Sequence, residues 1–90
     1  MKKVLVEFIN TWPSCDSIGR NVEDAASKFG DLVEVKLYRV GKDVDYIKKY
    51  GMIFTGTMII NENKRVTRLS RKNIEHEIRI AVDELKQSME

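Results

Sequence analysis

The chain has 90 residues, of which 42% are hydrophobic and 33% are charged, and its net charge is +2. This length suits one small domain with a modest core, so residues 1–90 are expected to form a single domain. The charges of both signs are well mixed, which gives no overall field that would demand nucleic acid as a partner. A single cysteine excludes an internal disulfide and a cysteine-rich metal site, and it fits a reducing compartment.

The first apolar run predicts a buried strand. In residues 3–9, every residue after Lys3 is apolar except Glu7. Such a composition is typical of a central strand that is covered on both faces. The run is too short for a signal peptide or a membrane span. We therefore expect a cytoplasmic protein without a membrane partner.

A helix is predicted next, because apolar residues recur at helical spacing on one face. These residues are Ile18, Val22, Ala25, Ala26 and Phe29. Gly30 follows them at the place where a residue in the left-handed conformation commonly ends a helix.

Residues 32–40 then alternate between apolar and polar side chains. Val33, Val35 and Leu37 would share one side of a strand, and the charged residues between them would share the other. This pattern is typical of a strand with one solvated face, which favours a position at the edge of a sheet.

The second half of the chain predicts a short helix and a hairpin. Asp43 is placed to cap the helix, and Gly51 is placed to end it. Residues 57–60 and 65–69 predict two strands, and the polar residues 61–64 between them have the composition of a turn. The two strands should therefore pair as an antiparallel hairpin.

The last predicted element is a helix that Ser70 caps. Its apolar face consists of Ile74, Ile78, Ala81, Val82 and Leu85. The complete order is βαβαββα, which predicts an α/β fold with a four-stranded mixed sheet flanked by three helices. The first two strands are joined through a helix, so they should be parallel with a right-handed crossover.

The thiol stands at the junction between the first strand and the first helix. The loop Asn10-Thr11-Trp12-Pro13-Ser14-Cys15 connects these two elements, and a thiol at such a junction is typical of dithiol redox proteins. The chain resembles the thioredoxin-like superfamily in its small, glutaredoxin-sized form. The resemblance rests on this thiol, on the βαβαββα order, on a helix that ends in Phe29-Gly30 and on the later strand Thr57–Asn61. The resemblance covers essentially the whole chain.

The resemblance implies a thioredoxin-like fold with a Cys-x-x-Cys active site, in which the first thiolate attacks and the second resolves the mixed disulfide. In this chain the motif is Trp12-Pro13-Ser14-Cys15. Either Cys15 takes the second family position and Trp12 replaces the nucleophile, or Cys15 takes the first and Ile18 replaces the resolving thiol. Pro13 and the helix pattern after Cys15 favour the former. Gly56 stands where the family carries a cis-proline before the third strand.

One thiol cannot cycle between a dithiol and an internal disulfide, but it can form a mixed disulfide with a protein partner or with glutathione. Cys15 is therefore the candidate catalytic residue, and whether the protein is an enzyme stays open. The alternative function is a non-enzymatic interaction or dimerisation module. Its candidate binding residues are Trp12, Pro13, Ser14, Phe54, Thr55 and Gly56.

No cofactor or metal site is predicted. The five glycines are dispersed and form no phosphate-binding loop, and His76 has no second histidine at zinc-motif spacing. Residues 64–72 carry a local group of basic side chains, but no nucleic-acid-binding motif accompanies them. We expect a solvated face there and no specific nucleic-acid partner.

Overall fold

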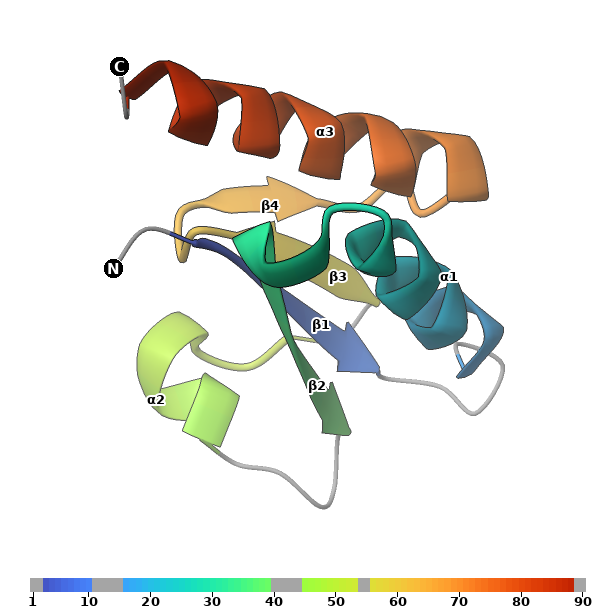
Figure 1. The fold of residues 1–90 in the computed structure, drawn as a ribbon. Coiled ribbons are helices and arrows are strands. Elements are labelled where there is room, and N and C mark those ends of the chain that lie inside the picture. The colour runs from blue at the N-terminus through green and yellow to red at the C-terminus, as the bar shows by residue number, and fades with distance from the viewer. Residues whose placement is uncertain (1–2, 11–15, 40–44, 54–55, 89–90) are drawn as a thin grey trace.

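The computed structural model describes residues 3–10, 16–39, 45–53 and 56–88. Figure 1 shows the order of the elements along the chain. They are β1 (Val4–Asn10), α1 (Asp16–Ser27), the short 3-10 helix η2 (Gly30–Leu32), β2 (Val33–Arg39), α2 (Asp45–Tyr50), β3 (Thr57–Ile60), β4 (Lys64–Val66) and α3 (Arg71–Ser88). The predicted α/β fold with a four-stranded mixed sheet and three α-helices is confirmed for the described part of the chain.

The strands form one sheet in the order β2-β1-β3-β4. β1 pairs with β2 in parallel, from Val4 opposite Val33 to Asn10 opposite Arg39. β3 is antiparallel to both β1 and β4. The predicted central position of the first strand, the edge position of the second and the antiparallel hairpin are therefore all confirmed.

The larger core lies on the face of the sheet that α1 and α3 cover (Figure 1). Val4, Val6 and Phe8 point from β1 into this core and are at most 1% exposed. They pack together with Val22 of α1 and Ile78 of α3, among others. Every second residue of β1 is thus buried on this side, as a strand with alternating faces requires.

A smaller core lies on the opposite face, under α2. It joins Ile9 of β1 and Ile59 of β3 to Tyr46 of α2 and to Ile53, all of them buried. Since apolar side chains on both faces of β1 are covered, the almost unbroken apolar run of this strand has a direct structural explanation.

Two residues that the sequence places on apolar faces, Leu37 and Leu85, are less buried than expected. Leu37 is 46% exposed, although Val33 and Val35 on the same side of β2 pack against the larger core. The C-terminal half of this edge strand lies away from α3 in Figure 1, so this core does not extend over Leu37. Leu85, near the C-terminal end of α3, is only partly buried where it packs against the larger core.

Three element boundaries also differ from the expectation. α1 ends at Ser27 rather than near Phe29, and β4 covers Lys64–Val66 rather than residues 65–69. Gly30 and Gly51 have φ angles of 57° and 77°, so both occupy the left-handed conformation expected after a helix. The amide of Gly51 donates to the carbonyl of Ile47 at 2.8 Å and ends α2.

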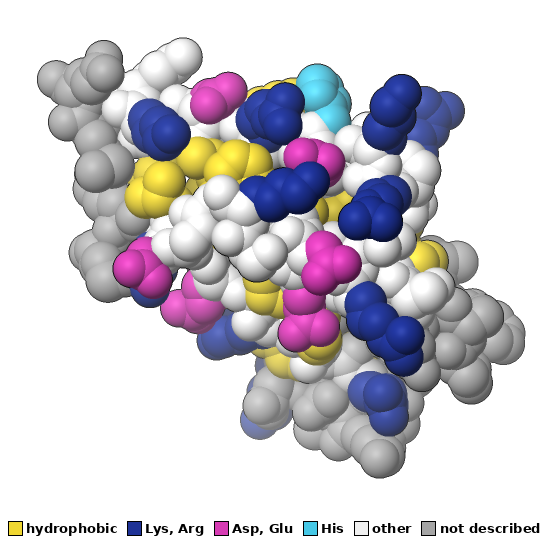
Figure 2. Space-filling model, turned by 45° about the vertical axis from the view of Figure 1, so that its right-hand side comes forward, with side chains coloured by type: hydrophobic (Ala, Val, Ile, Leu, Met, Phe, Trp, Pro, Cys, Tyr) yellow, Lys and Arg dark blue, Asp and Glu magenta, His cyan; other side chains and the backbone are white. Residues whose placement is uncertain are grey.

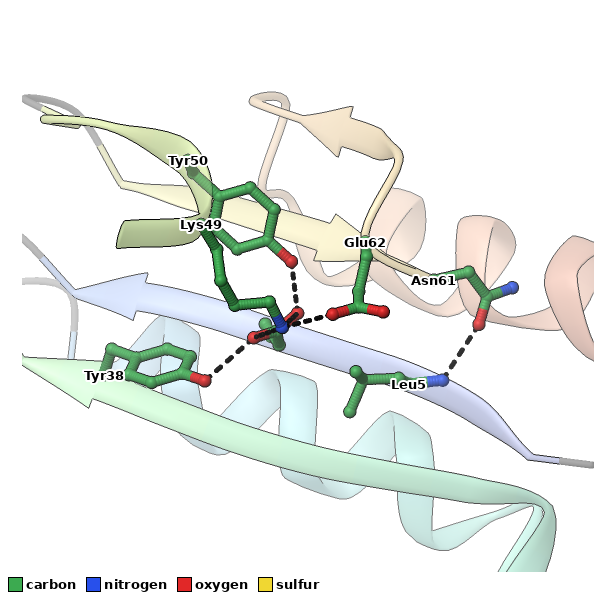
Figure 3. Close-up of polar contacts among 7 residues, drawn as sticks. Leu5, Tyr38, Lys49, Tyr50, Asn61 and Glu62 are labelled. Carbon is green, nitrogen blue, oxygen red and sulfur yellow. Dashed lines mark hydrogen bonds and ion pairs between the residues drawn. The ribbon is translucent and has the colours of Figure 1, made fainter. Parts of the chain in front are cut away.

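The turn between β3 and β4 has two residues in the left-handed conformation. Asn61 and Glu62 have φ angles of 54° and 62°. The Asn61 side-chain Oδ1 accepts a hydrogen bond from the Leu5 amide at 3.0 Å, and the Asn61 amide donates to the Leu5 carbonyl at 2.8 Å (Figure 3). Asn61 thereby extends the pairing of β1 and β3 by one residue, and it fixes the turn in which Glu62 lies.

Candidate functional site

The predicted thiol site falls mostly outside the described residues. Trp12, Pro13, Ser14, Cys15, Phe54 and Thr55 all lie in the segments 11–15 and 54–55, which the structure does not describe. Gly56 is described; it is partly buried and directly precedes β3. The structure thus places the residues that flank the predicted site.

The flanking residues come together at one end of the sheet. Ile9, near the C-terminal end of β1, pairs with Thr57, the first residue of β3. Segment 11–15 continues from the end of β1, and segment 54–55 leads through Gly56 into β3. Asp16, the residue after Cys15, is the first residue of α1. The two predicted site segments are therefore attached to neighbouring strand ends in the two central strands.

A second site, which the sequence analysis missed, lies on the α2 face of the sheet. Glu7 is fully buried in the middle of the central strand β1. Its partners are Tyr38 of β2 together with Lys49 and Tyr50 of α2, and Lys49 also pairs with Glu62 (Figure 3). We call Glu7, Tyr38, Lys49, Tyr50 and Glu62 the Glu7 cluster.

Both oxygens of the Glu7 carboxylate accept hydrogen bonds. The Tyr50 hydroxyl donates to Oε1 at 2.5 Å, and the Tyr38 hydroxyl donates to Oε2 at 2.8 Å. The Lys49 ammonium donates to both oxygens at 3.4 and 3.3 Å. A buried carboxylate needs this kind of compensation, because an unpaired charge in the interior is very costly. The cluster therefore ties β1 to β2 and α2 through polar contacts.

The electrostatics of the cluster keep Glu7 ionised. Burial by itself would raise the pKa of Glu7, but the hydrogen bonds from Tyr50, Tyr38 and Lys49 together outweigh it, so that the pKa lies below its ordinary value. Burial, and then the hydrogen bond to Glu7 and its negative charge, raise the pKa of Tyr50 to about 12. The hydrogen bond to Glu62 raises the pKa of Lys49, and the contact with Glu7 raises it further. Burial acts in the opposite direction but is outweighed.

Lys49 connects the buried part of the cluster to the surface of the protein. Its side chain is 35% exposed and lies between buried Glu7 and half-exposed Glu62. The Lys49 ammonium also lies 5.4 Å from the ring centre of Tyr50, and the Arg65 guanidinium lies 5.8 Å from the same ring. Arg65 further donates to the Tyr50 carbonyl at 3.2 Å. β4 is thus also connected to the end of α2.

These properties favour a structural role for the Glu7 cluster. A general acid or base works best with a pKa near the operating pH, whereas the pKa shifts of Glu7, Lys49 and Tyr50 all move away from neutrality. The carboxylate is also buried and fully occupied by donors from the chain itself. We conclude that the cluster holds α2 against the sheet.

The basic group at residues 64–72 is partly engaged in contacts within the chain. Lys64 pairs with Glu77 at 2.6 Å, in addition to the Arg65 contacts with Tyr50. Figure 2 shows basic and acidic side chains interspersed over one face of the molecule. Among the described residues, no group of three or more His, Cys, Asp or Glu side chains is arranged to hold a metal ion.

Comparison of the chain with protein-family models, with curated proteins and with solved structures finds no match. In the described part of the chain, no helix has both the length and the apolar character needed to cross a membrane.

Proposed function

We propose that this chain is a single-thiol protein of the thioredoxin-like type, which acts by forming one mixed disulfide between Cys15 and a protein partner or glutathione. The observation that carries the proposal is the start of α1 at Asp16, directly after Cys15. A thiol at the N-terminus of a helix has its thiolate stabilised by the helix dipole, by about 0.3–1 kcal/mol at an exposed site. The thiolate is the form that attacks disulfides.

The arrangement of the sheet supports the same proposal. The parallel β1-α1-β2 unit is followed by an antiparallel β3–β4 hairpin and a final helix, in the element order of the resemblance. The end of β1 and the start of β3 are neighbours through the pair Ile9 and Thr57. In the thioredoxin-like superfamily these two ends carry the active-site loop and the segment that faces it. Because fold alone does not define function, the chemistry of Cys15 has to be tested directly.

Exposure to oxidised glutathione tests the proposed step. The Cys15 thiolate attacks one sulfur of the glutathione disulfide, that S–S bond breaks, and one glutathione leaves as a thiolate while the other stays bound to Cys15. We expect the wild type to gain one glutathione by mass spectrometry and Cys15→Ser to gain none.

We also expect no turnover of insulin disulfides with dithiothreitol, because no resolving thiol is present. A Cys15-dependent turnover would contradict the proposal.

Trp12→Cys tests which family position Cys15 occupies. If Cys15 takes the second position, the new thiol lies three residues upstream, at the spacing of Cys-x-x-Cys, and should close an internal disulfide with Cys15. The matched variant Ile18→Cys should close this disulfide only if Cys15 takes the first position. Free-thiol titration after mild oxidation distinguishes the two. Failure of both variants to form the bond would contradict a thioredoxin-like arrangement of this loop.

A second candidate function is protein binding through the same end of the sheet, without redox chemistry. Met52 favours it: this side chain is 59% exposed and lies close in sequence to the predicted binding residues Phe54, Thr55 and Gly56. Tryptophan is enriched at binding hot spots, and in the thioredoxin-like superfamily the loop that corresponds to residues 12–15 is where partner polypeptides dock. Trp12→Ala should then reduce association by about 2 kcal/mol or more without changing thiol reactivity.

A further inference from the structure

The edge strand β2 has features that the thiol chemistry leaves unused. It is seven residues long and forms one border of the sheet, with β1 on its inner side. No described strand pairs with its outer side. By contrast, β4 at the other border has only three residues. A strand edge that no other strand covers is a template for pairing with another strand, and residues 33–37 of β2 provide such an edge in the described sheet.

The sequence of β2 is self-complementary when it is reversed. The residues Val33-Glu34-Val35-Lys36-Leu37 have an acidic and a basic residue symmetrically on either side of Val35. Both charged side chains are exposed, and among the described residues neither forms an ion pair within its own chain. Leu37 is 46% exposed on the opposite side of the strand.

We infer that the outer edge of β2 is a self-association surface, which binds β2 of a second copy of this chain in the antiparallel direction with Val35 at the two-fold axis. In this register Glu34 of each copy lies directly opposite Lys36 of the other, and Val33 lies opposite Leu37. Opposite charges at directly facing positions stabilise a strand pair, and facing apolar side chains do the same. The contact is isologous, as two-fold symmetry requires.

The neighbouring symmetric registers are unfavourable, which makes the inferred one specific. Directly opposed residues of an antiparallel pair lie on the same face of the sheet. One strand can therefore shift along the other only by two residues at a time, and each such shift moves the two-fold axis by one residue. An axis at Lys36 places the two Lys36 side chains opposite each other, and an axis at Glu34 does the same for the two Glu34 side chains. Like charges at facing positions are destabilising. Only the axis at Val35 pairs each of these charges with its opposite.

The inferred contact also covers exposed apolar surface. Leu37, which the larger core leaves half exposed, would contact Val33 of the second copy on the side of the sheet that carries α1 and α3. The two Val35 side chains would meet at the axis between them. The contact, in which residues 33–37 of the two copies face one another, is small compared with stable interfaces, which bury about 1,600 Å². The dimer should therefore be weak, and because exposed charges are screened, salt should weaken it further.

Charge exchange at two exposed positions tests this inference. The experiment is sedimentation equilibrium over a range of concentrations at low salt, with dithiothreitol present so that no disulfide through Cys15 contributes. The wild type should show a monomer–dimer equilibrium. Glu34→Lys and Lys36→Glu each place like charges opposite each other and should weaken dimerisation at least tenfold. The double exchange Glu34→Lys/Lys36→Glu restores opposite charges in the same register and should recover the wild-type affinity.

A mixture of the two single variants gives the sharpest discrimination. One variant carries two basic residues at these positions and the other carries two acidic residues, so the mixture should form heterodimers although each variant alone is monomeric. All substituted side chains are exposed, and circular dichroism checks that the fold is retained. A wild type that stays monomeric at millimolar concentration overturns the inference. So does equal dimerisation of the wild type and both single variants.

Discussion

Replacement of Glu7 by alanine should lower the free energy of unfolding by about 3 kcal/mol or more, because it leaves several polar groups on α2 and β2 without their acceptor. The Tyr38 and Tyr50 hydroxyls both donate to this carboxylate, which is fully buried in the central strand. Lys49 loses less, since its side chain is 35% exposed and keeps its contact with Glu62. Urea unfolding followed by circular dichroism measures the loss.

Three further variants separate the role of the cluster from the general effect of mutation. Tyr38→Phe and Tyr50→Phe each remove one hydrogen bond to a charged group, which contributes about 1.5–3 kcal/mol. Glu23→Gln changes an exposed carboxylate on α1 and should alter stability by less than about 0.5 kcal/mol. If Glu7→Ala were no more destabilising than Glu23→Gln, the structural role of the cluster would be wrong.

The pH dependence of stability should carry the signature of Glu7. Its pKa is lower in the folded protein than the ordinary value of 4.5, so the folded state favours the ionised form. This contribution to stability is complete at pH values above about 4.5 and is lost as the pH falls through the lower folded-state pKa. Glu7→Gln should make the free energy of unfolding depend less steeply on pH in this acidic range. Part of the dependence should remain, because the hydrogen bond from Lys28 also lowers the pKa of Glu75.

Substitution of Ile78 by alanine is the second change with a large expected effect, about 2–5 kcal/mol. Ile78 is fully buried and joins α3 to the core that Val6 and Phe8 of β1 enter. Removal of its side chain leaves a cavity that the surrounding helices and sheet fill only in part. Leu85→Ala is the matched comparison on the same helix, and it should cost clearly less because Leu85 is only partly buried. The reverse order of these two losses in urea unfolding would contradict the described packing of α3.

The sequence was sufficient to predict those parts of the fold in which apolar spacing decides the outcome. The apolar run of β1 indicated a strand buried on both faces, and the alternation in β2 indicated an edge strand. The spacing of Ile74, Ile78, Ala81 and Val82 identified the buried face of α3. Where a segment lies at a margin of the core, as with Leu37 and Leu85, periodicity alone overestimated burial, because it does not show how far the covering layer extends.

The Glu7 cluster was not predicted, for a different reason. The three residues that donate hydrogen bonds to Glu7 lie 31 to 43 residues from it along the chain, and only the folded sheet and α2 bring them together. One indication was present in the sequence: a carboxylate interrupts the apolar run of a strand predicted to be covered on both faces. Buried carboxylates are almost always paired, so Glu7 could have been assigned partners, although Tyr38, Lys49 and Tyr50 could not have been chosen from periodicity.

The acid dissociation of the Cys15 thiol tests the proposed function most directly. The chain has a single cysteine, so the rate of alkylation by iodoacetamide as a function of pH reports the pKa of this one thiol, with Cys15→Ser as the blank. The proposal of a reactive thiol at the start of α1 predicts a pKa clearly below the value of about 8.5 for free cysteine. A pKa at or above that value would contradict redox action through Cys15 and would favour a binding module instead.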